Sequence, residues 1–132
     1  MLPAWLRRLF GSRSENAAAR YLRQQGLRIL TRNYTCPLGE LDLVALDDEC
    51  IVFVEVRSTS STDVEKTALS VDAAKQKRLT QLALHYLSRH KLLNQPARFD
   101  VLVLSWPKKQ KSPRIIHYRQ AFEAVGRGQI YS

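Results

Sequence analysis

The sequence predicts an α/β fold in which a mixed central sheet is flanked by helices. Three observations support this class. Two long segments have helical periodicity, strand-like apolar runs lie between and after them, and turn residues separate the runs. The predicted order is one helix, three strands, a second helix and two further strands. A chain of 132 residues can form one such domain around a single core.

The domain is predicted to occupy residues 12–125, between an N-terminal extension (1–11) and a C-terminal tail (126–132). The extension carries apolar side chains close to two arginines. It could touch a membrane or a partner helix, or form a frayed or packed N-terminal turn. No segment approaches the roughly 20 apolar residues that a membrane span requires.

The first helix is predicted over residues 12–25, because its alanines favour a helix and Gly26 is a natural terminator. Ser12 and Glu15 have the S-x-x-E spacing of a capping box. Glu15 also lies on the same helix face as Leu22. It therefore has two interpretations, a local cap or an acidic group directed along the buried face towards the sheet.

The first strands follow this helix. One strand is predicted over residues 27–34, and a hairpin over residues 39–57 (GELDLVALDDECIVFVEVR) comes next. Both faces of the hairpin are largely apolar, so we expect other elements to cover both. Asp42, Glu55 and Arg57 interrupt these apolar runs and need a specific explanation.

The register of the hairpin predicts which of these residues meet. With a four-residue loop at residues 47–50, Asp42 opposes Glu55 and Glu40 opposes Arg57 on one face. Directly opposed side chains have Cβ atoms about 5 Å apart. Two carboxylates at this separation repel each other unless a positive charge lies between them.

Asp42 and Glu55 are therefore candidate ligands of Mg²⁺ or Mn²⁺. These ions prefer oxygen ligands and accept a substrate phosphate oxygen. A metal held in this way can polarise a phosphodiester and activate a bound water. The alternative is structural, since the carboxylates could pair with Arg57 or Lys75 and form only a polar network between sheet and helix.

The segment after the hairpin connects it to the second helix. Residues 58–66 are polar and are predicted to form a loop. The second helix is expected to begin at Ser70 or Asp72 and to end at His90. Lys75 extends its buried stripe at the N-terminal end, or its long side chain simply reaches the solvent.

Two strands complete the predicted sheet, at residues 99–106 and 114–118. A final helical turn is expected at residues 121–125. Asp100 is the one polar residue inside the first of these two strands. We interpret it as a hydrogen-bonding residue at the strand end rather than as a metal ligand.

The chain is strongly basic, with 21 Lys and Arg residues against 12 Asp and Glu residues and a net charge of +9. Such a surplus favours a partner rich in phosphate, above all nucleic acid. An inert basic surface is the simpler alternative. Lys108, Lys109 and Lys111 could contact nucleic acid beside Trp106, or form a solvated loop.

The two cysteines, Cys36 and Cys50, form neither a disulfide framework nor a zinc motif. Free thiols are therefore expected, as in the reducing cytoplasm. Together with the lack of a membrane span, this predicts a cytoplasmic protein.

Parts of the sequence resemble the YraN-like family of small bacterial proteins, which is related to the restriction-endonuclease-like nucleases with the motif PD-(D/E)xK. They are residues 39–42 (GELD), residues 52–57 (VFVEVR), Lys75, and residues 98–101 (RFDV). The resemblance extends over residues 12–122. It implies a restriction-endonuclease-like core and a Mg²⁺-dependent endonuclease that acts on DNA, rather than RNA, with branched or damaged DNA as a suitable substrate.

The resemblance also implies catalytic roles for Asp42, Glu55, Arg57 and Lys75. Asp42 and Glu55 match the metal-binding acids of the motif, and Glu15 matches a helical glutamate that many superfamily members add to the metal site. Arg57 stands at the position of the motif lysine, and an arginine stays protonated and cannot act as a base. It could instead hold a phosphate in a bidentate fork. Lys75 could replace the missing lysine and, like Arg57, contact nucleic acid.

Three hypotheses follow. The protein is a metal-dependent endonuclease, or a non-catalytic nucleic-acid-binding module in which Arg57 has ended the chemistry, or a structural protein whose acids and bases form a closed network. Resolvase-like relatives often work as dimers, and cutting two strands needs two sites. The resemblance therefore allows a homodimer.

Overall fold

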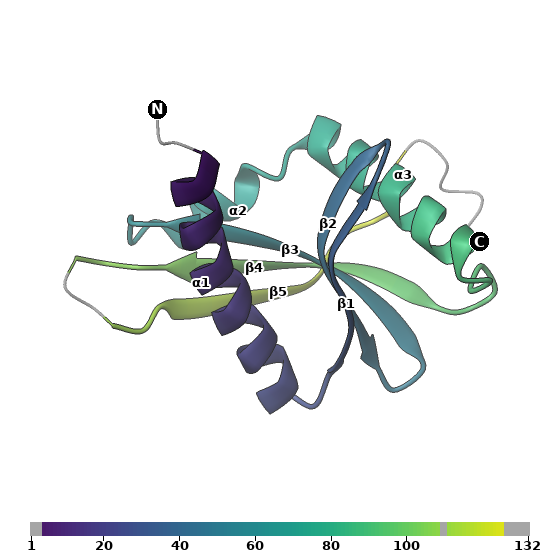
Figure 1. Cartoon of the computed structure of the whole chain (residues 1–132), viewed down its shortest axis with the longest axis horizontal. Helices are drawn as coiled ribbons and strands as arrows, with labels where there is room; N and C mark the ends of the chain where they lie inside the picture. The colour runs from purple at the N-terminus through teal and green to yellow at the C-terminus, as the bar shows by residue number, and fades with distance from the viewer. Residues whose placement is uncertain (1–3, 109–110, 126–132) are drawn as a thin grey trace.

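The computed structural model describes residues 4–108 and 111–125 (Figure 1). Lys109 and the whole predicted C-terminal tail (126–132) lie outside the described residues. The elements are, in order, α1 (Ala4–Gln24), β1 (Arg28–Cys36), β2 (Gly39–Asp47), β3 (Cys50–Thr59), α2 (Val64–Leu69), α3 (Ala73–Arg89), β4 (Ala97–Ser105) and β5 (Arg114–Phe122).

The strands form one five-stranded sheet in the order β1-β2-β3-β4-β5. β3 and β4 are parallel, and the other neighbours are antiparallel. The helices α2 and α3 lie in the connection between the two parallel strands, as a parallel crossover requires. The predicted α/β class with a mixed sheet flanked by helices is confirmed.

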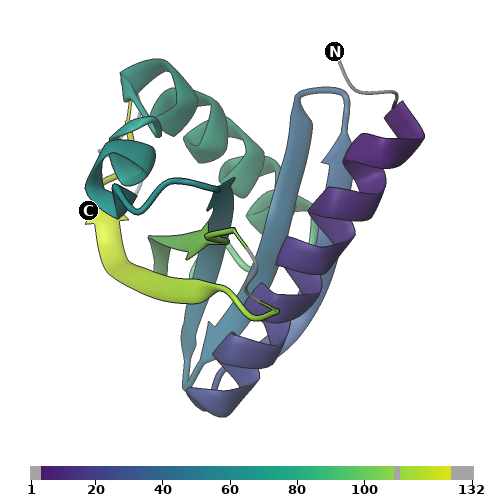
Figure 2. The same ribbon diagram turned by 90° about the vertical axis from the view of Figure 1, so that its left-hand side faces the viewer.

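Helices cover both faces of the sheet. α1 packs on one face, and α3 with α2 lies on the other (Figure 2). The core on the α1 side includes Leu22, Leu43 and Leu102, and the core on the α3 side includes Phe53 and Leu82, all of them buried. β3 contributes apolar side chains to both cores, which explains why its residues 51–54 are all apolar instead of alternating with polar ones.

Three predictions about the secondary structure are wrong: the start of the first helix, the loop after the hairpin and the final helical turn. α1 begins at Ala4 rather than at Ser12, so Ser12 lies inside the helix and the Ser12–Glu15 capping box cannot form. Part of the segment predicted as a loop forms α2, because the Asp63 side chain caps it by accepting a hydrogen bond from the backbone N–H of Lys66 at 3.1 Å. The final helical turn is absent from the described residues, since β5 continues to Phe122.

The predicted register of the β2–β3 hairpin is confirmed where the strands pair, with Val44 opposite Phe53. The loop is shorter than predicted, since Asp47 pairs with Cys50 and only two residues turn the chain. The predicted pairing of Glu40 with Arg57 is wrong. The β2–β3 ladder ends before Glu40, which lies opposite Thr35 of β1 instead.

Candidate functional site

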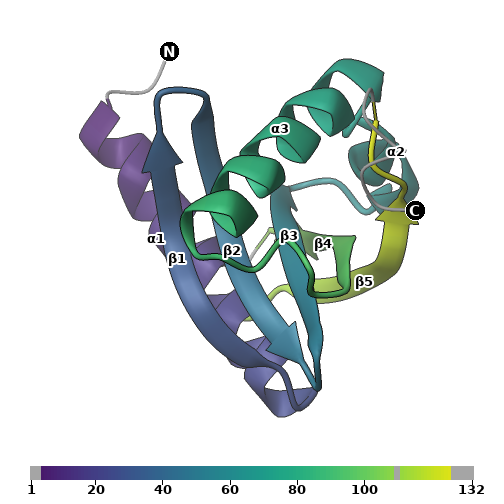
Figure 3. The ribbon, with the colours of Figure 1, turned by 90° about the vertical axis from the view of Figure 1, so that its right-hand side faces the viewer.

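The candidate site lies where β2 and β3 diverge. Their last paired residues are Leu43 and Val54, whereas β2 stays paired with β1 as far as Gly39. The β1–β2 hairpin therefore rises away from β3 (Figure 3). Asp42 is the first residue beyond the ladder, and its carboxylate accepts a hydrogen bond from the backbone N–H of Val56 at 2.8 Å. We call this divergence of β2 and β3 the fork. Here the Asp42 side chain accepts the hydrogen bond that a backbone carbonyl would accept in a continuing ladder.

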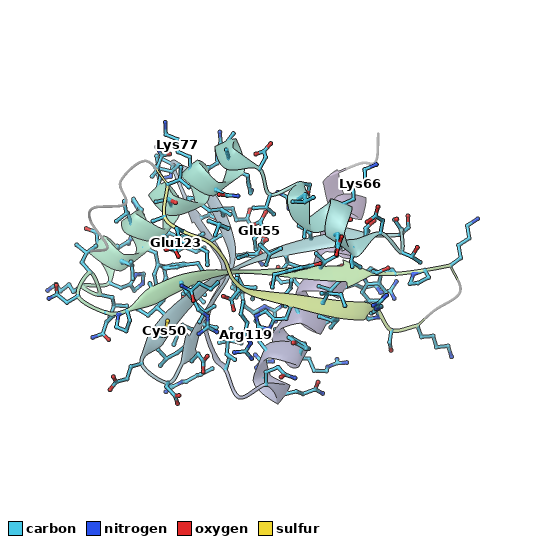
Figure 4. The ribbon with its side chains drawn as sticks, turned by 180° about the vertical axis from the view of Figure 1, so that it is seen from behind. Cys50, Glu55, Lys66, Lys77, Arg119 and Glu123 are labelled. Atoms are coloured by element: carbon cyan, nitrogen blue, oxygen red, sulfur yellow. The ribbon has the colours of Figure 1, made fainter. Side chains whose placement is uncertain are left out.

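Glu55 is the second carboxylate of the fork and lies on the side of the sheet that faces α3 (Figure 4). It is buried, with 6% of its side chain exposed. Two cations contact its Oε2 atom: Arg57 Nη2 at 3.2 Å and Lys75 Nζ at 3.4 Å. The two cations are about equally exposed, so both remain accessible to a ligand from solvent.

Lys75 comes from the first turn of α3, far along the chain from the hairpin. Asp72 caps this helix, and its side chain accepts a hydrogen bond from the backbone N–H of Lys75 at 2.9 Å. The cap fixes the start of the helix and with it the position of the Lys75 ammonium group. Lys75 forms an ion pair with Glu55 and keeps about a third of its side chain exposed, so it contacts the hairpin while its ammonium group remains open to solvent.

The electrostatics of the fork are unbalanced. Burial and the neighbouring charge of Glu55 raise the pKa of Asp42 to about 7, against the opposing effects of the Val56 hydrogen bond and Lys75. In addition, Arg57 Nε is buried and has no hydrogen-bond partner. Such an atom is costly to leave unpaired. The fork therefore combines a carboxylate pair whose repulsion is not fully offset with a guanidinium N–H that lacks an acceptor.

Glu15, the predicted third acid, is engaged elsewhere. Its carboxylate accepts hydrogen bonds from Arg32 Nε at 2.8 Å and from Asn33 Nδ2 at 3.0 Å. Asn33 has a φ of 53°, which kinks β1. Because of this kink, the successive side chains of Arg32 and Asn33 both point to α1, whereas Tyr34 reaches α3. Within residues 4–108 and 111–125 no three or more Asp, Glu, His or Cys side chains converge as a metal site. The structure thus brings Asp42 and Glu55 together without Glu15.

The basic loop after β4 is anchored to α1. Trp106 Nε1 donates a hydrogen bond to the Ser14 hydroxyl at 3.1 Å, and the guanidinium of Arg13 lies 4.3 Å from the centre of the indole ring. Lys108 and Lys111 are exposed beside this anchor. Arg13 already covers one face of the indole, which leaves at most the other for a base.

A second polar cluster was missed by sequence reasoning, although the interpretation of Asp100 as a hydrogen-bonding residue is confirmed. Asp100 is fully buried and accepts hydrogen bonds from Arg98 Nε at 3.0 Å, His117 Nε2 at 2.7 Å and the backbone N–H of Gln120 at 3.0 Å. Burial alone would raise the pKa of Asp100, but these bonds hold it below its ordinary value. The spacing of these residues in the sequence contains no signal for the cluster.

Comparison with known proteins shows the family of this chain. The sequence profile of a family described as "Uncharacterised protein family UPF0102" matches residues 14–104. The chain belongs to the UPF0102 family. This confirms the resemblance to the YraN-like family that the GELD and VFVEVR segments indicate.

Several relatives carry the name UPF0102 protein. The one from Rhodopirellula baltica is 44% identical over 124 residues, which cover 92% of this chain and 74% of the relative. The relative from Moorella thermoacetica is 47% identical over 105 residues (80% and 87%). The relative from Pelotomaculum thermopropionicum is 40% identical over 116 residues (88% and 97%). These names state a family and no activity.

Two further predictions concern membrane-spanning segments and the state of the cysteines. In the part of the chain that the structure describes, no helix combines the length and apolar character needed to cross a membrane. Cys36 and Cys50 are free thiols, as predicted.

Proposed function

We propose that this UPF0102 protein is a Mg²⁺-dependent endonuclease that hydrolyses DNA phosphodiesters. The observation that supports this most strongly is the contact between two carboxylates at the strand fork, beside two cations. Asp42 and Glu55 would hold the metal, and Arg57 and Lys75 would face the scissile phosphate. Branched or damaged DNA is the proposed substrate class, and cleavage of both strands would require two copies of the chain.

The fork fits a hard divalent cation, Mg²⁺ or Mn²⁺. Burial and, after it, repulsion by Glu55 raise the pKa of Asp42, and a cation between the two carboxylates would remove the repulsion. Carboxylate oxygens are the ligands that these ions prefer. When bound, the ion would polarise the phosphodiester and lower the pKa of a bound water. Glu15 could join only if it left Arg32 and Asn33, so we propose two protein carboxylates as the core of the site.

The two cations have separable roles. Arg57 Nε, which has no partner, is placed to donate to a phosphate oxygen, and the guanidinium stabilises negative charge that develops there. Because arginine stays protonated, Arg57 does not take a proton from water. Lys75 contacts Glu55 from α3 and is the only described lysine that pairs with a carboxylate of the fork. It is therefore the candidate to orient the attacking water.

The basic surface supports binding of nucleic acid. Arg13, Lys108 and Lys111 lie around Trp106, and the net charge of +9 favours a polyanion at low salt. Lys109 belongs to the same proposal through the sequence alone. Ser14 links this surface to the fork, since its hydroxyl also bonds Ser58, which directly follows Arg57.

A second candidate function is a non-catalytic nucleic-acid-binding module. The pairing of Arg57 with Glu55 at 3.2 Å favours it, because a permanent cation occupies the position of the motif lysine and neutralises one metal ligand. In that case the protein would bind DNA without cutting it, and Mg²⁺ would have little effect.

An endonuclease assay separates the two candidates. Purified protein would be incubated with supercoiled plasmid and with a synthetic four-way junction, with Mg²⁺, Mn²⁺ or EDTA. We expect metal-dependent cleavage that disappears in Asp42→Asn and Glu55→Gln, while both variants still bind DNA. Asp47→Asn is the matched control, since it removes a carboxylate outside the fork. Lack of cleavage of any substrate by the wild type, together with salt-sensitive binding, would favour the second candidate.

Arg57→Lys tests the departure from the motif. If a lysine at this position is the missing catalytic group, the substitution raises the cleavage rate. If Lys75 already fulfils that role, Lys75→Met abolishes cleavage and Arg57→Lys changes it little. Single-turnover rates of the three proteins distinguish these outcomes.

A further inference from the structure

A groove of about 580 Å³ lies on the α3 side of the sheet, and its lining contains none of the four charged residues of the fork. It is bounded by α2, the beginning of α3, and the strands β4 and β5. Its volume is in the range of sites that hold small ligands, about 300–1,000 Å³. The side chains that line it include Ala68, Leu69, Gln76, Val101 and Tyr118.

The groove is adjacent to the fork. Glu55 of β3 pairs with Val101 of β4, and Val101 pairs with Tyr118 of β5, so the three residues form one row across the sheet. Neighbouring strands are about 4.8 Å apart, which places Tyr118 about 10 Å from Glu55 along the sheet. Val101 and Tyr118 belong to the core on the α3 side, the side on which Lys75 meets Glu55. Groove and fork therefore share a face.

The chemistry of the groove differs from that of the fork. Its floor is apolar, with the phenol ring of Tyr118 and the amide of Gln76 among its polar groups. Gln76 Nε2 donates to the carbonyl of Val71 at 3.0 Å, which fixes the amide and leaves its oxygen as an acceptor. The two charged lining residues, Glu65 and Arg119, have opposite signs. Such a surface suits a flat ring with polar edges and is a poor site for phosphate.

Two exposed lysines lie near the groove but outside its lining. Lys66 and Lys77 extend from α2 and α3 on the side of Glu55 (Figure 4), and both are exposed. At the rim, 78% of Leu69 is exposed, the largest value among the exposed large apolar residues in the described chain. In sites that bind unpaired bases, cations contact the backbone of the nucleic acid while a groove stacks the base. The groove and these lysines have this arrangement.

We propose that this groove binds one unstacked base of the nucleic acid whose phosphate lies at the fork. The inference rests on the proposed function and names the feature of the substrate that the site selects. Because extruding a base is least costly where it is mismatched or unpaired, the protein prefers DNA in which a base can leave the stack. A fully paired duplex of the same length is bound mainly through its phosphates.

The test compares two DNA duplexes of one sequence, one fully paired and one with a single extrahelical 2-aminopurine. Binding is measured in EDTA, so that no cleavage occurs. We expect the wild type to bind the bulged duplex about tenfold more tightly and to change the fluorescence of the 2-aminopurine. Equal affinity for the two duplexes would overturn the proposal.

Two variants provide the matched comparison. Ala68→Trp fills the groove, and Ala124→Trp places the same side chain in a separate cavity at the other end of α3. The first should lose the preference for the bulged duplex and keep the affinity for the paired one, whereas the second should keep both. If Ala68→Trp does not fold, Leu69→Ser replaces it, because an exposed side chain can be changed without loss of the core. A preference that survives in the groove variant contradicts the proposal.

The outcomes also separate this inference from the proposed function. Metal-dependent cleavage of both duplexes with equal affinity would leave the endonuclease intact and remove the base groove. A preference for the bulged duplex without cleavage would keep the groove and favour the non-catalytic module. Absence of binding to either duplex would end both proposals.

Discussion

Two clusters of acidic and basic side chains lie on opposite faces of the central sheet. The closed cluster (Asp47, Arg98, Asp100 and His117) faces α1, where Tyr21 contacts His117. The open cluster (Asp42, Glu55, Arg57 and Lys75) faces α3. Each contains two carboxylates, yet the pKa of Asp100 is lowered and that of Asp42 is raised to about 7.

The difference comes from how many donors each carboxylate receives. Asp100 accepts bonds from three groups, so burial does not leave its charge unpaired. Asp42 accepts from one backbone N–H and lies beside a second carboxylate, and Arg57 Nε in the same cluster has no acceptor. A cluster that satisfies itself stabilises the fold, whereas one that does not is typical of a ligand site.

The largest expected difference is in stability. Asp100→Asn should lower the free energy of unfolding by about 3–5 kcal/mol, because it removes the charged partner of the buried His117 side chain and one of the two charged partners of half-buried Arg98. Asp42→Asn should be neutral or stabilising by about 1 kcal/mol, since the amide oxygen still accepts from Val56 and the repulsion with Glu55 is removed. Urea unfolding followed by circular dichroism measures both. A similar loss in the two variants would show that the open cluster is structural.

Metal addition should act on only one cluster. With Mg²⁺ at about a hundred times its dissociation constant, the wild type should be stabilised by about 2.7 kcal/mol. Asp42→Asn should lose this gain, whereas Asp47→Asn, in the closed cluster, should retain it. Thermal unfolding with and without Mg²⁺ gives the comparison, and an equal shift in both variants would argue against a metal site at the fork.

The two aspartates should also give opposite pH dependences. Because the pKa of Asp42 is raised to about 7, the folded state binds its proton more tightly than the unfolded chain does, so stability should fall as pH rises from about 4 to about 7, by on the order of 1–2 kcal/mol. Asp100 has a lowered pKa, so its contribution is complete above the ordinary pKa of aspartate and is lost as pH falls through its lowered value. Unfolding curves of the wild type and Asp42→Asn at each pH isolate the first effect. A slope that persists unchanged in the variant would assign it to other groups.

The smallest expected effect concerns Lys75. Lys75→Met should change the free energy of unfolding by about 0.5 kcal/mol or less, because the lysine is partly exposed and Glu55 keeps Arg57 as a partner. The same substitution at Arg98, which pairs with both Asp47 and Asp100, should cost several times more. Denaturant midpoints of the two variants are the measurement, and a large loss at Lys75 would mean that the open cluster also stabilises the fold.

The α/β class and the proximity of Asp42 to Glu55 could be predicted from the amino-acid sequence. Both follow from short-range geometry, because side chains alternate along a strand and the register of a hairpin follows from its turn. The same reasoning failed at Glu40, which lies beyond the point where β2 leaves β3, and at Glu15, where the kink at Asn33 turns two successive residues of β1 towards α1. The alternation of side chains along a regular strand does not predict where a strand kinks or leaves its neighbour.

Which charged side chains find partners depends on how the helices and strands pack together. Lys75 reaches Glu55 because α3 packs over β3, and Asp100 meets His117 because β5 pairs with β4. These partners are separated by long stretches of chain, so neither composition nor spacing encodes their contact directly. The same sequence features, an acid within an apolar strand, therefore became a closed structural cluster at Asp100 and an open candidate site at Asp42.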